Sequence, residues 1–362
     1  MKKIELCEKY DLWTYLKNAK KPIVMYGMGN GADKIINICS EYGIEICDFF
    51  ASDGFVRGHK FHNKTVLTYG EIKEKYQDFI VLLSFASSLE EVLCNIYKIA
   101  AEQELYVPDV PVFGNTLFNY EFWEENYEKF VKVYNLLADE RSREVYVDTI
   151  CAKLSGKLSY FKSSECDKDE INSGIIHPGK YKTYADLGAY NGDTIREILS
   201  TAPNIEKIYA LEPDRRNFRK LNEYAVNEER CSIECHNCGA WSSDKTLYFS
   251  DSGNRNASFS DVKPTDGKIK EIEVRRLDSI LLGRPVDYIK YDVEGAEAEA
   301  IDGSVEAITK HSPDLLISLY HRGEDLFTLP IKINEINPDY KLYLRRLPYL
   351  PAWDLNLYAI KE

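Results

Sequence analysis

The segment 184–194, YADLGAYNGDT, combines glycines and carboxylates at a spacing suited to binding a small ligand. Gly188 and Gly192 bracket a tight turn after an apolar strand, and glycine lets a backbone bend sharply and approach a ligand closely. Asp186 and Asp193 place a carboxylate at each end of this turn. Because two negative charges favour a cation over a phosphate, the turn is predicted to bind a positively charged ligand.

A further carboxylate lies at the end of the next predicted strand. In the segment IYALEPD, Glu212 stands where a carboxylate can accept hydrogen bonds from both hydroxyls of a ribose. The third strand is followed by NCGAW, 237–241, where the base of a nucleoside should lie. Strand, glycine turn, helix and strand in this order predict a nucleoside-binding α/β unit.

Candidate catalytic groups end the fourth and fifth predicted strands. Asp292 and Glu294 lie in DYIKYDVEGAE, and His321 lies in LYHRGED. Ligands bind at the carboxyl ends of strands in open α/β sheets, so these groups are expected at one edge. An imidazole can accept a hydroxyl proton, but His321 could equally cap the helix that begins near Glu324. Asp292 and Glu294 could hold a divalent metal, yet two carboxylates alone are weak evidence, and no metal is predicted.

Four motifs in order, DLGAYNGDT, ALEPD, CGAW and IKYDVEGAE, resemble the FkbM family of S-adenosylmethionine-dependent methyltransferases. The resemblance covers roughly 136–360. It implies a class I methyltransferase fold with a doubly wound, Rossmann-like sheet and a terminal antiparallel hairpin. It also implies S-adenosylmethionine in the glycine turn and a hydroxyl acceptor on a sugar or polyketide.

S-adenosylmethionine is a cation that needs a carboxylate for its ribose, a flat apolar slot for its adenine and backbone groups for its amino-acid end. The residues expected to bind it are Asp186, Gly188, Ala189, Tyr190, Gly192, Asp193, Thr194, Glu212, Pro213, Asp214, Asn237, Gly239 and Ala240. Methyl transfer to oxygen is an in-line displacement that requires alignment and removal of a hydroxyl proton. The residues expected to do this are His321, Asp292 and Glu294.

The predicted function is therefore O-methylation of a hydroxyl on a sugar, glycan or related metabolite. The alternative is a non-catalytic scaffold with a methyltransferase fold that binds a nucleotide or sugar nucleotide. A third hypothesis is a nicotinamide-dependent oxidoreductase, but no Ser/Tyr/Lys constellation follows the first glycine loop at a suitable spacing. The expected partner is a small-molecule or glycan acceptor, and a homodimer is possible.

Three parts are predicted along the chain: a Rossmann-like α/β domain, 1–115, a helical connector and lid, 116–182, and the methyltransferase domain, 183–362. The first part has its own glycine loop, KPIVMYGMGNGADKI. Gly27, Gly29 and Ala32 approximate a dinucleotide fingerprint, and Asp48 or Asp53 could meet a ribose. A tight turn that binds nothing is the competing interpretation, and strong NAD binding is not expected.

Local patterns predict several further elements. A capping box from Ser88 to Glu91 should open one helix, and 117–155 should form two helices. The polar segment 159–182 should be a loop or lid beside the site. The third strand should run through 231–241, one helix should occupy 296–311, and 246–262 should be a strand followed by a loop.

Composition excludes other classes. The chain has 362 residues and a net charge of −13, which disfavours binding to a nucleic acid backbone. No apolar run approaches the roughly 18 residues of a membrane span, and the first residues show no signal peptide. Nine scattered cysteines fit a reduced, cytoplasmic setting. Cys231, Cys235 and Cys238 have the spacing of an iron–sulfur motif, but buried thiols on a strand are the preferred interpretation.

Overall fold

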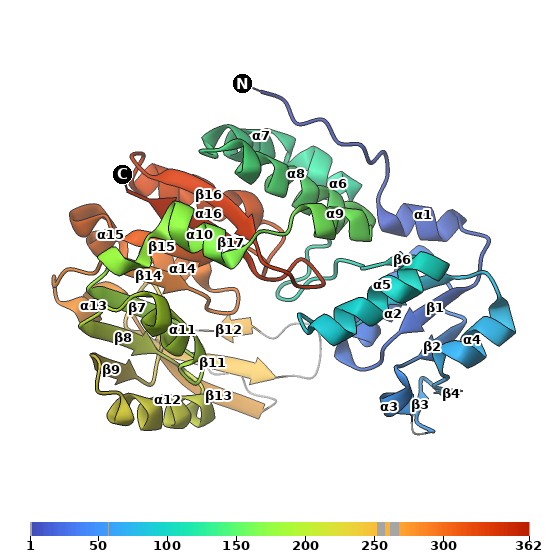
Figure 1. Ribbon diagram of the computed structural model, residues 1–362, viewed down its shortest axis with the longest axis horizontal. Helices are drawn as coiled ribbons and strands as arrows, with labels where there is room; N and C mark the ends of the chain where they lie inside the picture. The colour runs from blue at the N-terminus through green and yellow to red at the C-terminus, as the bar shows by residue number, and fades with distance from the viewer. Residues whose placement is uncertain (1, 57, 252–257, 261–267, 362) are drawn as a thin grey trace.

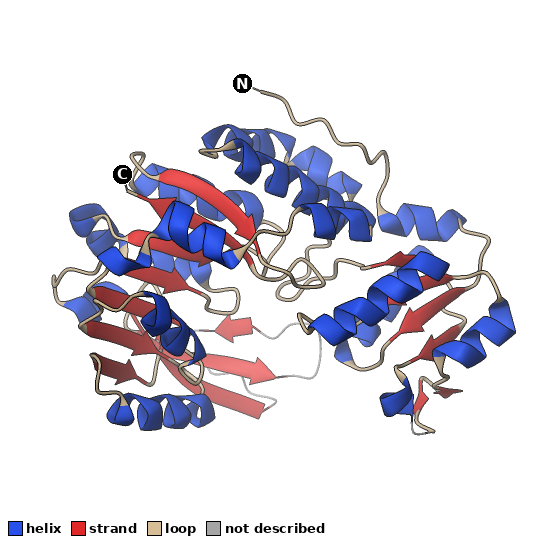
Figure 2. Ribbon diagram, viewed as in Figure 1, coloured by secondary structure: helices blue, strands red, loops and turns tan. Residues whose placement is uncertain are grey.

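The computed structural model describes residues 2–56, 58–251, 258–260 and 268–361. Figure 1 shows two lobes, each built on its own sheet, with the helices α6 to α9 above and between them. Figure 2 shows helices flanking the strands in both lobes, so each lobe is an α/β layer structure, as predicted. Within the described residues, no helix is long and apolar enough to cross a membrane.

The N-terminal lobe contains a parallel sheet in the order β2-β1-β5-β6. Its strands are β1 (Ile23–Tyr26), β2 (Asp48–Phe50), β5 (Ile80–Leu83) and β6 (Glu104–Tyr106). Every residue of the two central strands is buried, because helices cover both faces. The other elements are α1 (Leu12–Asn18), α2 (Asn30–Tyr42), α3 (Asp53–Val56), β3 (Lys60–Phe61), β4 (Lys64–Thr65), α4 (Tyr69–Tyr76) and α5 (Glu90–Glu102).

The predicted capping box from Ser88 to Glu91 is wrong. Helix α5 begins at Glu90, and its N-cap, Leu89, makes no side-chain cap hydrogen bond. A capping box instead opens α4, where the side chains of Thr68 and Glu71 each accept a hydrogen bond from the other residue's backbone N–H. The Ser-x-x-Glu pattern alone therefore did not fix where the helix starts.

The connector is more helical than predicted. Segment 117–155 forms three helices rather than two, because the chain also breaks at Asn126: α6 (Tyr120–Glu125), α7 (Tyr127–Leu136) and α8 (Glu140–Ser155). Segment 159–182 is not a loop. It forms α9 (Leu158–Ser163), α10 (Lys168–Ile171), the π-helical turn η1 (Asn172–Ile176) and the 3₁₀ turn η2 (Pro178–Lys180).

The C-terminal lobe contains a seven-stranded sheet in the order β16-β17-β15-β14-β7-β8-β9. Its strands are β7 (Thr183–Leu187), β8 (Lys207–Leu211), β9 (Ser232–His236), β14 (Tyr288–Tyr291), β15 (Asp314–Ser318), β16 (Lys341–Arg346) and β17 (Leu355–Ile360). The first five are parallel, and the terminal pair is antiparallel, as predicted. Strand order reverses on the two sides of β7, and such a switch point is where open α/β sheets bind ligands.

Alternate residues of the central strands face two separate cores. Tyr184 and Tyr288 pack with α10, η1 and α11, whereas Ala185 and Ile289 pack on the opposite face with α13 to α16. The flanking helices are α11 (Asp193–Thr201), α12 (Arg215–Asn227), α13 (Leu277–Leu281), α14 (Glu297–Asp302), α15 (Val305–His311) and α16 (Asp325–Ile336). This covering on both faces confirms the doubly wound fold.

Two predicted elements of this lobe are split. A single helix over 296–311 is wrong, because the chain breaks at Gly303, where a Cβ would lie 2.0 Å from the carbonyl oxygen of Trp241. The third strand ends at His236, and the following residues join a second sheet. That sheet contains β10 (Gly239–Ala240), β11 (Lys245–Asp251), β12 (Ser258–Ser260) and β13 (Lys268–Arg275). Parts of the loop predicted after β11 lie outside the described residues.

Candidate active site

The glycine turn after β7 is held from two sides. The N–H groups of Gly188 and Ala189 donate to the carbonyl of Leu211, at 3.0 and 2.9 Å. Gly188 has a φ of +91°, and a Cβ there would lie 1.9 Å from the carbonyl oxygen of Asp292. The turn is therefore packed between the ends of β8 and β14, at a distance that only glycine allows.

Glu212 connects this turn to the start of α12. Its Oε2 accepts from the backbone N–H of Tyr190 at 2.9 Å, and its Oε1 accepts from that of Asp214 at 2.7 Å. The side chain is buried, and this burial raises the pKa of Glu212, although the two N–H groups act in the opposite direction. The sequence predicted a ribose ligand here and missed that the same carboxylate holds two loops in place.

A cavity of about 470 Å³ lies beside the turn. Among the predicted donor residues, its lining includes Gly188, Tyr190, Asp193, Thr194, Glu212, Pro213, Asp214, Gly239 and Ala240. Trp241, Ile272 and Val274 add apolar surface that the sequence analysis had not included. The other predicted donor residues, Asp186, Ala189, Gly192 and Asn237, do not line this cavity.

Asp186 does not line the cavity but contacts two residues that do. Its side chain is fully buried and accepts a hydrogen bond from the hydroxyl of Thr194. Its Oδ1 lies 3.4 Å from Nζ of Lys290, and the same ammonium lies 3.2 Å from Oδ2 of Asp292. Burial lowers the pKa of Lys290, but the two carboxylates outweigh it and raise the pKa above its usual value.

Lys290 is a site residue that the sequence analysis missed. It is directly opposite Asp186 in the pairing of β7 with β14. Because side chains alternate along a strand, Lys290 and Asp292 project to the same face. The sequence did contain a signal for Lys290. This lysine lies two positions before the strand-end Asp292, in a strand predicted beside the one that carries Asp186.

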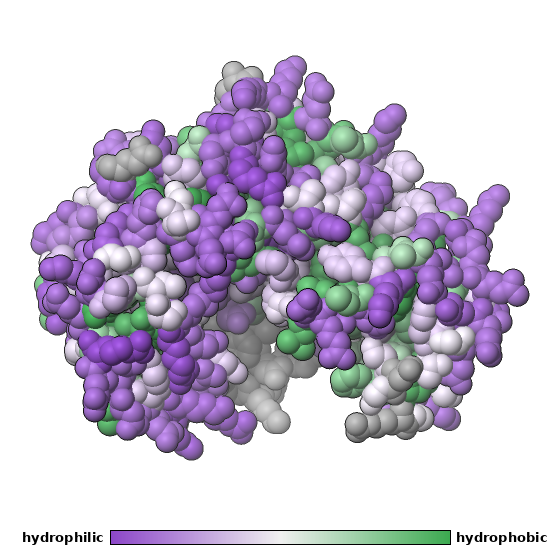
Figure 3. Space-filling model, viewed as in Figure 1, coloured by the Kyte–Doolittle hydropathy of each residue, from purple (hydrophilic) through white to green (hydrophobic). Residues whose placement is uncertain are grey.

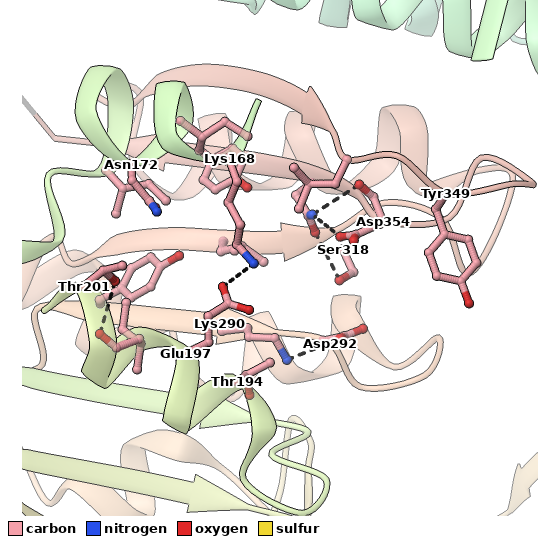
Figure 4. Close-up of a pocket in the computed structure, with 18 of the residues that line it drawn as sticks. Lys168, Asn172, Thr194, Glu197, Thr201, Lys290, Asp292, Ser318, Tyr349 and Asp354 are labelled. Atoms are coloured by element: carbon pink, nitrogen blue, oxygen red, sulfur yellow. Dashed lines mark hydrogen bonds and ion pairs between the residues drawn. The ribbon is translucent and has the colours of Figure 1, made fainter. Parts of the chain in front are cut away.

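A second cavity, of about 320 Å³, shares Thr194, Lys290 and Asp292 with the first. Figure 4 shows Lys168 and Asn172 on one side of it and Glu197 and Thr201 on another, with Tyr349 and Asp354 at its far end. Part of the segment predicted as a lid, Lys168, Ile171, Asn172 and Ile176, therefore does line the site, although as helix and not as loop.

The loop between β16 and β17 contributes Tyr349 and Trp353 to this second cavity. Their ring centroids are 5.7 Å apart. The same loop is anchored in the other lobe, because Leu350 is buried in the core of the N-terminal lobe. It also exchanges two backbone hydrogen bonds with Ser87, of 2.8 and 3.0 Å.

The three predicted catalytic side chains do meet. Nε2 of His321 lies 3.7 Å from Oδ1 of Asp292 and 3.5 Å from Oε2 of Glu294. Nδ1 of His321 lies 2.8 Å from Oε1 of Glu297, and the hydroxyl of Tyr320 donates to Oδ1 of Asp292 at 3.0 Å. Burial lowers the pKa of His321, but the hydrogen bond to Glu297 and the neighbouring carboxylates outweigh it and raise the pKa.

The alternative interpretation of His321 as a helix cap is wrong. The N-cap of α16 is Glu324, and the side chain of Asp325 accepts from the backbone N–H of Arg322. Glu297, which holds His321, was missed by the sequence analysis. Its Oε1 also accepts from the N–H of Val293 at 3.0 Å, whereas its Oε2 is buried and has no hydrogen-bond partner.

The other glycine loop and the cysteines stand apart from this site. Asp48 is buried and bound to Lys75 and Tyr76, which makes it a poor ribose ligand, and the side chain of Asp53 lies outside the described residues. Burial raises the pKa of Cys235 to about 11 and that of Cys238 to about 12.

Among the described residues, the set of three metal-binding donors within 4.8 Å of one another is Asp292, Glu297 and His321.

Residues 186–349 match the sequence model of the methyltransferase FkbM domain. Methyltransferase FkbM from Methylobacillus flagellatus KT is a similar solved structure, with a TM-score of 0.71 and 21% identity over 96% of this chain and 92% of that chain. Fibrillarin from Aeropyrum pernix, solved with bound S-adenosyl-L-methionine, reaches a TM-score of only 0.32 at 14% identity, over 51% of this chain and 68% of that chain. No curated protein matches the chain.

The similarity to the Methylobacillus structure extends over both lobes and shows a shared fold. The family match spans the glycine turn, Glu212, Asp292 and His321, so it covers the lining of the larger cavity and part of the lining of the smaller one. The chain therefore carries a methyltransferase FkbM domain in residues 186–349, and it is a methyltransferase that depends on S-adenosylmethionine.

Proposed function

We propose that the protein transfers the methyl group of S-adenosylmethionine to a hydroxyl of a sugar, glycan or related metabolite. The observation that carries this proposal is the pair of neighbouring cavities that share Thr194, Lys290 and Asp292 in their linings. A two-substrate displacement needs donor and acceptor in adjoining spaces with the reacting atoms at their junction. The larger cavity suits the donor, and the smaller one suits the acceptor.

Several features support donor binding in the larger cavity. Glu212 lines it and is available to the ribose, while Trp241, Ile272 and Val274 offer an apolar surface for the adenine. The carboxylates of Asp193, Asp214, Asp292 and Glu294 also line it and suit a sulfonium cation. Asp186, Ala189, Gly192 and Asn237 are proposed to shape this cavity from behind.

The smaller cavity has the mixed lining that a hydroxylated ring requires. Tyr349 and Trp353 present aromatic faces, and Asn172, Ser318 and Asp354 offer donors and acceptors for hydroxyl groups. Aromatic rings pack on the apolar face of a sugar, while polar groups fix its orientation. An acceptor hydroxyl at the junction would meet the proposed catalytic side chains Asp292, Glu294 and His321, which would align it and take up its proton.

We further propose that the chain divides into parts 1–115, 116–182 and 183–362, with chemistry confined to the last two.

The proposed acceptor class is tested with methyl-labelled S-adenosylmethionine and a panel of free sugars, nucleotide sugars and glycans, alongside phenols and carboxylic acids. Label should transfer to a hydroxylated sugar-type acceptor and not to the others. A folded protein that binds the donor but labels only phenols or acids would contradict the acceptor class.

Replacing Glu212 with Ala should weaken the binding of S-adenosylhomocysteine by about 2–4 kcal/mol, or about 30- to 1,000-fold in Kd. Alanine has no carboxylate, so the proposed hydrogen bonds to the ribose and those from the N–H groups of Tyr190 and Asp214 would be lost. Calorimetry measures the change, and Glu223→Ala on the exposed side of α12 is the control. An unchanged Kd in folded Glu212→Ala would remove Glu212 from the donor site.

The binding of S-adenosylhomocysteine should also depend on pH. Because burial raises the pKa of Glu212, donor affinity is full above that raised pKa and falls as the pH is lowered through it. The loss should begin at a higher pH than the titration of an exposed glutamate. Glu212→Gln, which does not titrate, should lack this step in calorimetry.

Replacing Trp353 with Ala should raise the KM for the acceptor by about tenfold, because the ring packs on it. The Kd of S-adenosylhomocysteine should remain near the parental value, since Trp353 does not line the donor cavity. Steady-state kinetics and calorimetry measure the two effects. Phe55→Ala, at an exposed aromatic residue of the N-terminal lobe, is the control. Unchanged KM in Trp353→Ala would place the acceptor elsewhere.

A further inference from the structure

The charged groups that line the smaller cavity do not balance. The lining contains two ammonium groups and three carboxylates, those of Lys168, Lys290, Glu197, Asp292 and Asp354. Nζ of Lys168 lies 2.6 Å from Oε1 of Glu197, so these two charges form a pair. Nζ of Lys290 lies 3.2 Å from Oδ2 of Asp292. The carboxylate that remains is that of Asp354, and no lysine, arginine or histidine in the described part of the chain forms an ion pair with it.

Asp354 is held in place by a neutral group. Its Oδ1 accepts a hydrogen bond from Nδ2 of Asn356 at 2.9 Å, and its φ of +61° is one that aspartate tolerates better than most residues. The residue is half-buried. Burial and the charges of Asp292 and Glu197 raise the pKa of Asp354, although Asn356 and Lys168 act in the opposite direction. The surroundings therefore disfavour the charged carboxylate, and a further cation beside it would be stabilising.

An acceptor that fills the smaller cavity would displace water from Asp354. A carboxylate that loses water is destabilised unless a hydrogen-bond donor or a cation takes the place of that water. Asn356 serves Oδ1, whereas no hydrogen bond from the described residues reaches Oδ2. The acceptor itself must therefore supply the group that compensates Oδ2.

The side chains next to Asp354 are aromatic. Trp353 precedes it in the chain, and the ring centroid of Tyr349 lies 5.7 Å from that of Trp353. Figure 4 shows Tyr349 and Asp354 at the same end of the cavity, and burial together with the charge of Asp354 raises the pKa of Tyr349. Because aromatic faces attract ammonium ions, a carboxylate beside two such rings suits a protonated amine. A neutral hydroxyl would leave the charge of Asp354 uncompensated.

We propose that the acceptor carries a protonated amino group in addition to the hydroxyl that is methylated, and that Asp354, Tyr349 and Trp353 bind this amino group. The inference rests on the proposed function and narrows the acceptor to an amino sugar or a glycan with a free amine. None of these three residues is shared with the larger cavity. The hydroxyl, and not the amine, would therefore face the donor.

The test compares sugars that differ at one carbon. Glucosamine, N-acetylglucosamine and glucose carry an amine, an amide and a hydroxyl there, and the galactose series repeats the comparison. With methyl-labelled S-adenosylmethionine, kcat/KM for the free amine should exceed that for the amide and for the neutral sugar by about 10- to 100-fold. Mass spectrometry of the product should locate the methyl group on oxygen.

Asp354→Asn separates charge from shape. Asparagine keeps an oxygen for the hydrogen bond from Asn356 and tolerates the positive φ. The KM for the amino sugar should rise by about 10- to 100-fold, whereas that for the neutral sugar should change by less than about threefold. Asp339→Asn, at an aspartate that is 71% exposed on the same lobe, is the control and should keep the preference for the amine. An unchanged Kd of S-adenosylhomocysteine shows that each variant has folded.

Three results would overturn the inference: equal kcat/KM for the amine and its neutral counterparts, a preference for the amine that survives Asp354→Asn, or a methyl group on nitrogen. The two proposals also fail separately. If neutral sugars are methylated as fast as amino sugars, methylation of a sugar hydroxyl stands and the amine site is wrong. If none of these sugars is methylated, the amine site is again wrong, and the wider panel of hydroxylated acceptors decides the proposed function.

Discussion

Asp292→Asn should lower the rate of methyl transfer by about 10³-fold, while the Kd of S-adenosylhomocysteine changes by less than about tenfold. Asp292 lines both cavities, and its carboxylate is bonded to Lys290 and Tyr320 and faces His321. Asparagine keeps the shape but loses the charge that balances Lys290. The acceptor hydroxyl would then lose both its alignment and the group that favours departure of its proton.

Single-turnover transfer from labelled donor measures this effect independently of product release. The matched control is Asp302→Asn, which removes an aspartate that is 48% exposed and pairs with Lys332 on the lobe surface. Its rate should stay within about twofold of the parental value, since surface ion pairs contribute little. A near-parental rate in folded Asp292→Asn would show that the junction of the cavities is not where the reaction occurs.

Gly188→Ala should lower the free energy of unfolding by about 3–5 kcal/mol and abolish measurable donor binding. The new Cβ would lie 1.9 Å from the carbonyl oxygen and 2.9 Å from the carbonyl carbon of Asp292. No side-chain rotation relieves a clash with backbone, and the φ of +91° is unfavourable for alanine. The ends of β7 and β14 would have to separate, which also displaces the turn from the donor cavity.

Thermal unfolding should show a fall in Tm of roughly 10 °C, and calorimetry should show the loss of S-adenosylhomocysteine binding. Gly174→Ala is the matched control, because a Cβ there meets nothing within 4 Å and its φ is not positive. Its Tm should change by no more than a few degrees. If Gly188→Ala melted like the control and still bound the donor, the close packing of the turn on β14 would be refuted.

The positions of the proposed donor residues could be predicted because these residues lie at strand ends that local patterns identify. Gly188 and Glu212 each follow a short apolar run, and parallel strands carry such ends to one edge whatever the remainder of the chain does. The terminal hairpin could also be predicted, because the alternation of its two strands and the turn in 347–354 are local sequence signals.

The acceptor side could not be predicted in the same way. Lys168 and Asn172 come from α10 and η1, and their positions depend on contacts of η1 with β17 and on the ion pair of Lys168 with Glu197 of α11. Trp353 depends on a loop anchored in the other lobe, and Glu297 on a hydrogen bond to His321. The prediction of one helix was also wrong at Gly303, where the close approach of the Trp241 carbonyl leaves no room for a Cβ and depends on a residue far away in sequence.

The anchoring of the 347–354 loop has a consequence for how such enzymes diverge. Tyr349 and Trp353 line the proposed acceptor cavity, yet the loop is held by Leu350 in the N-terminal core and by Ser87. Substitutions in the N-terminal lobe can therefore reshape one wall of the acceptor cavity without altering any residue of the glycine turn. Natural variation can change which acceptor is used through substitutions in a lobe that contributes no residue to the lining of the larger cavity. A change of substrate then need not pass through an enzyme that has lost its cofactor.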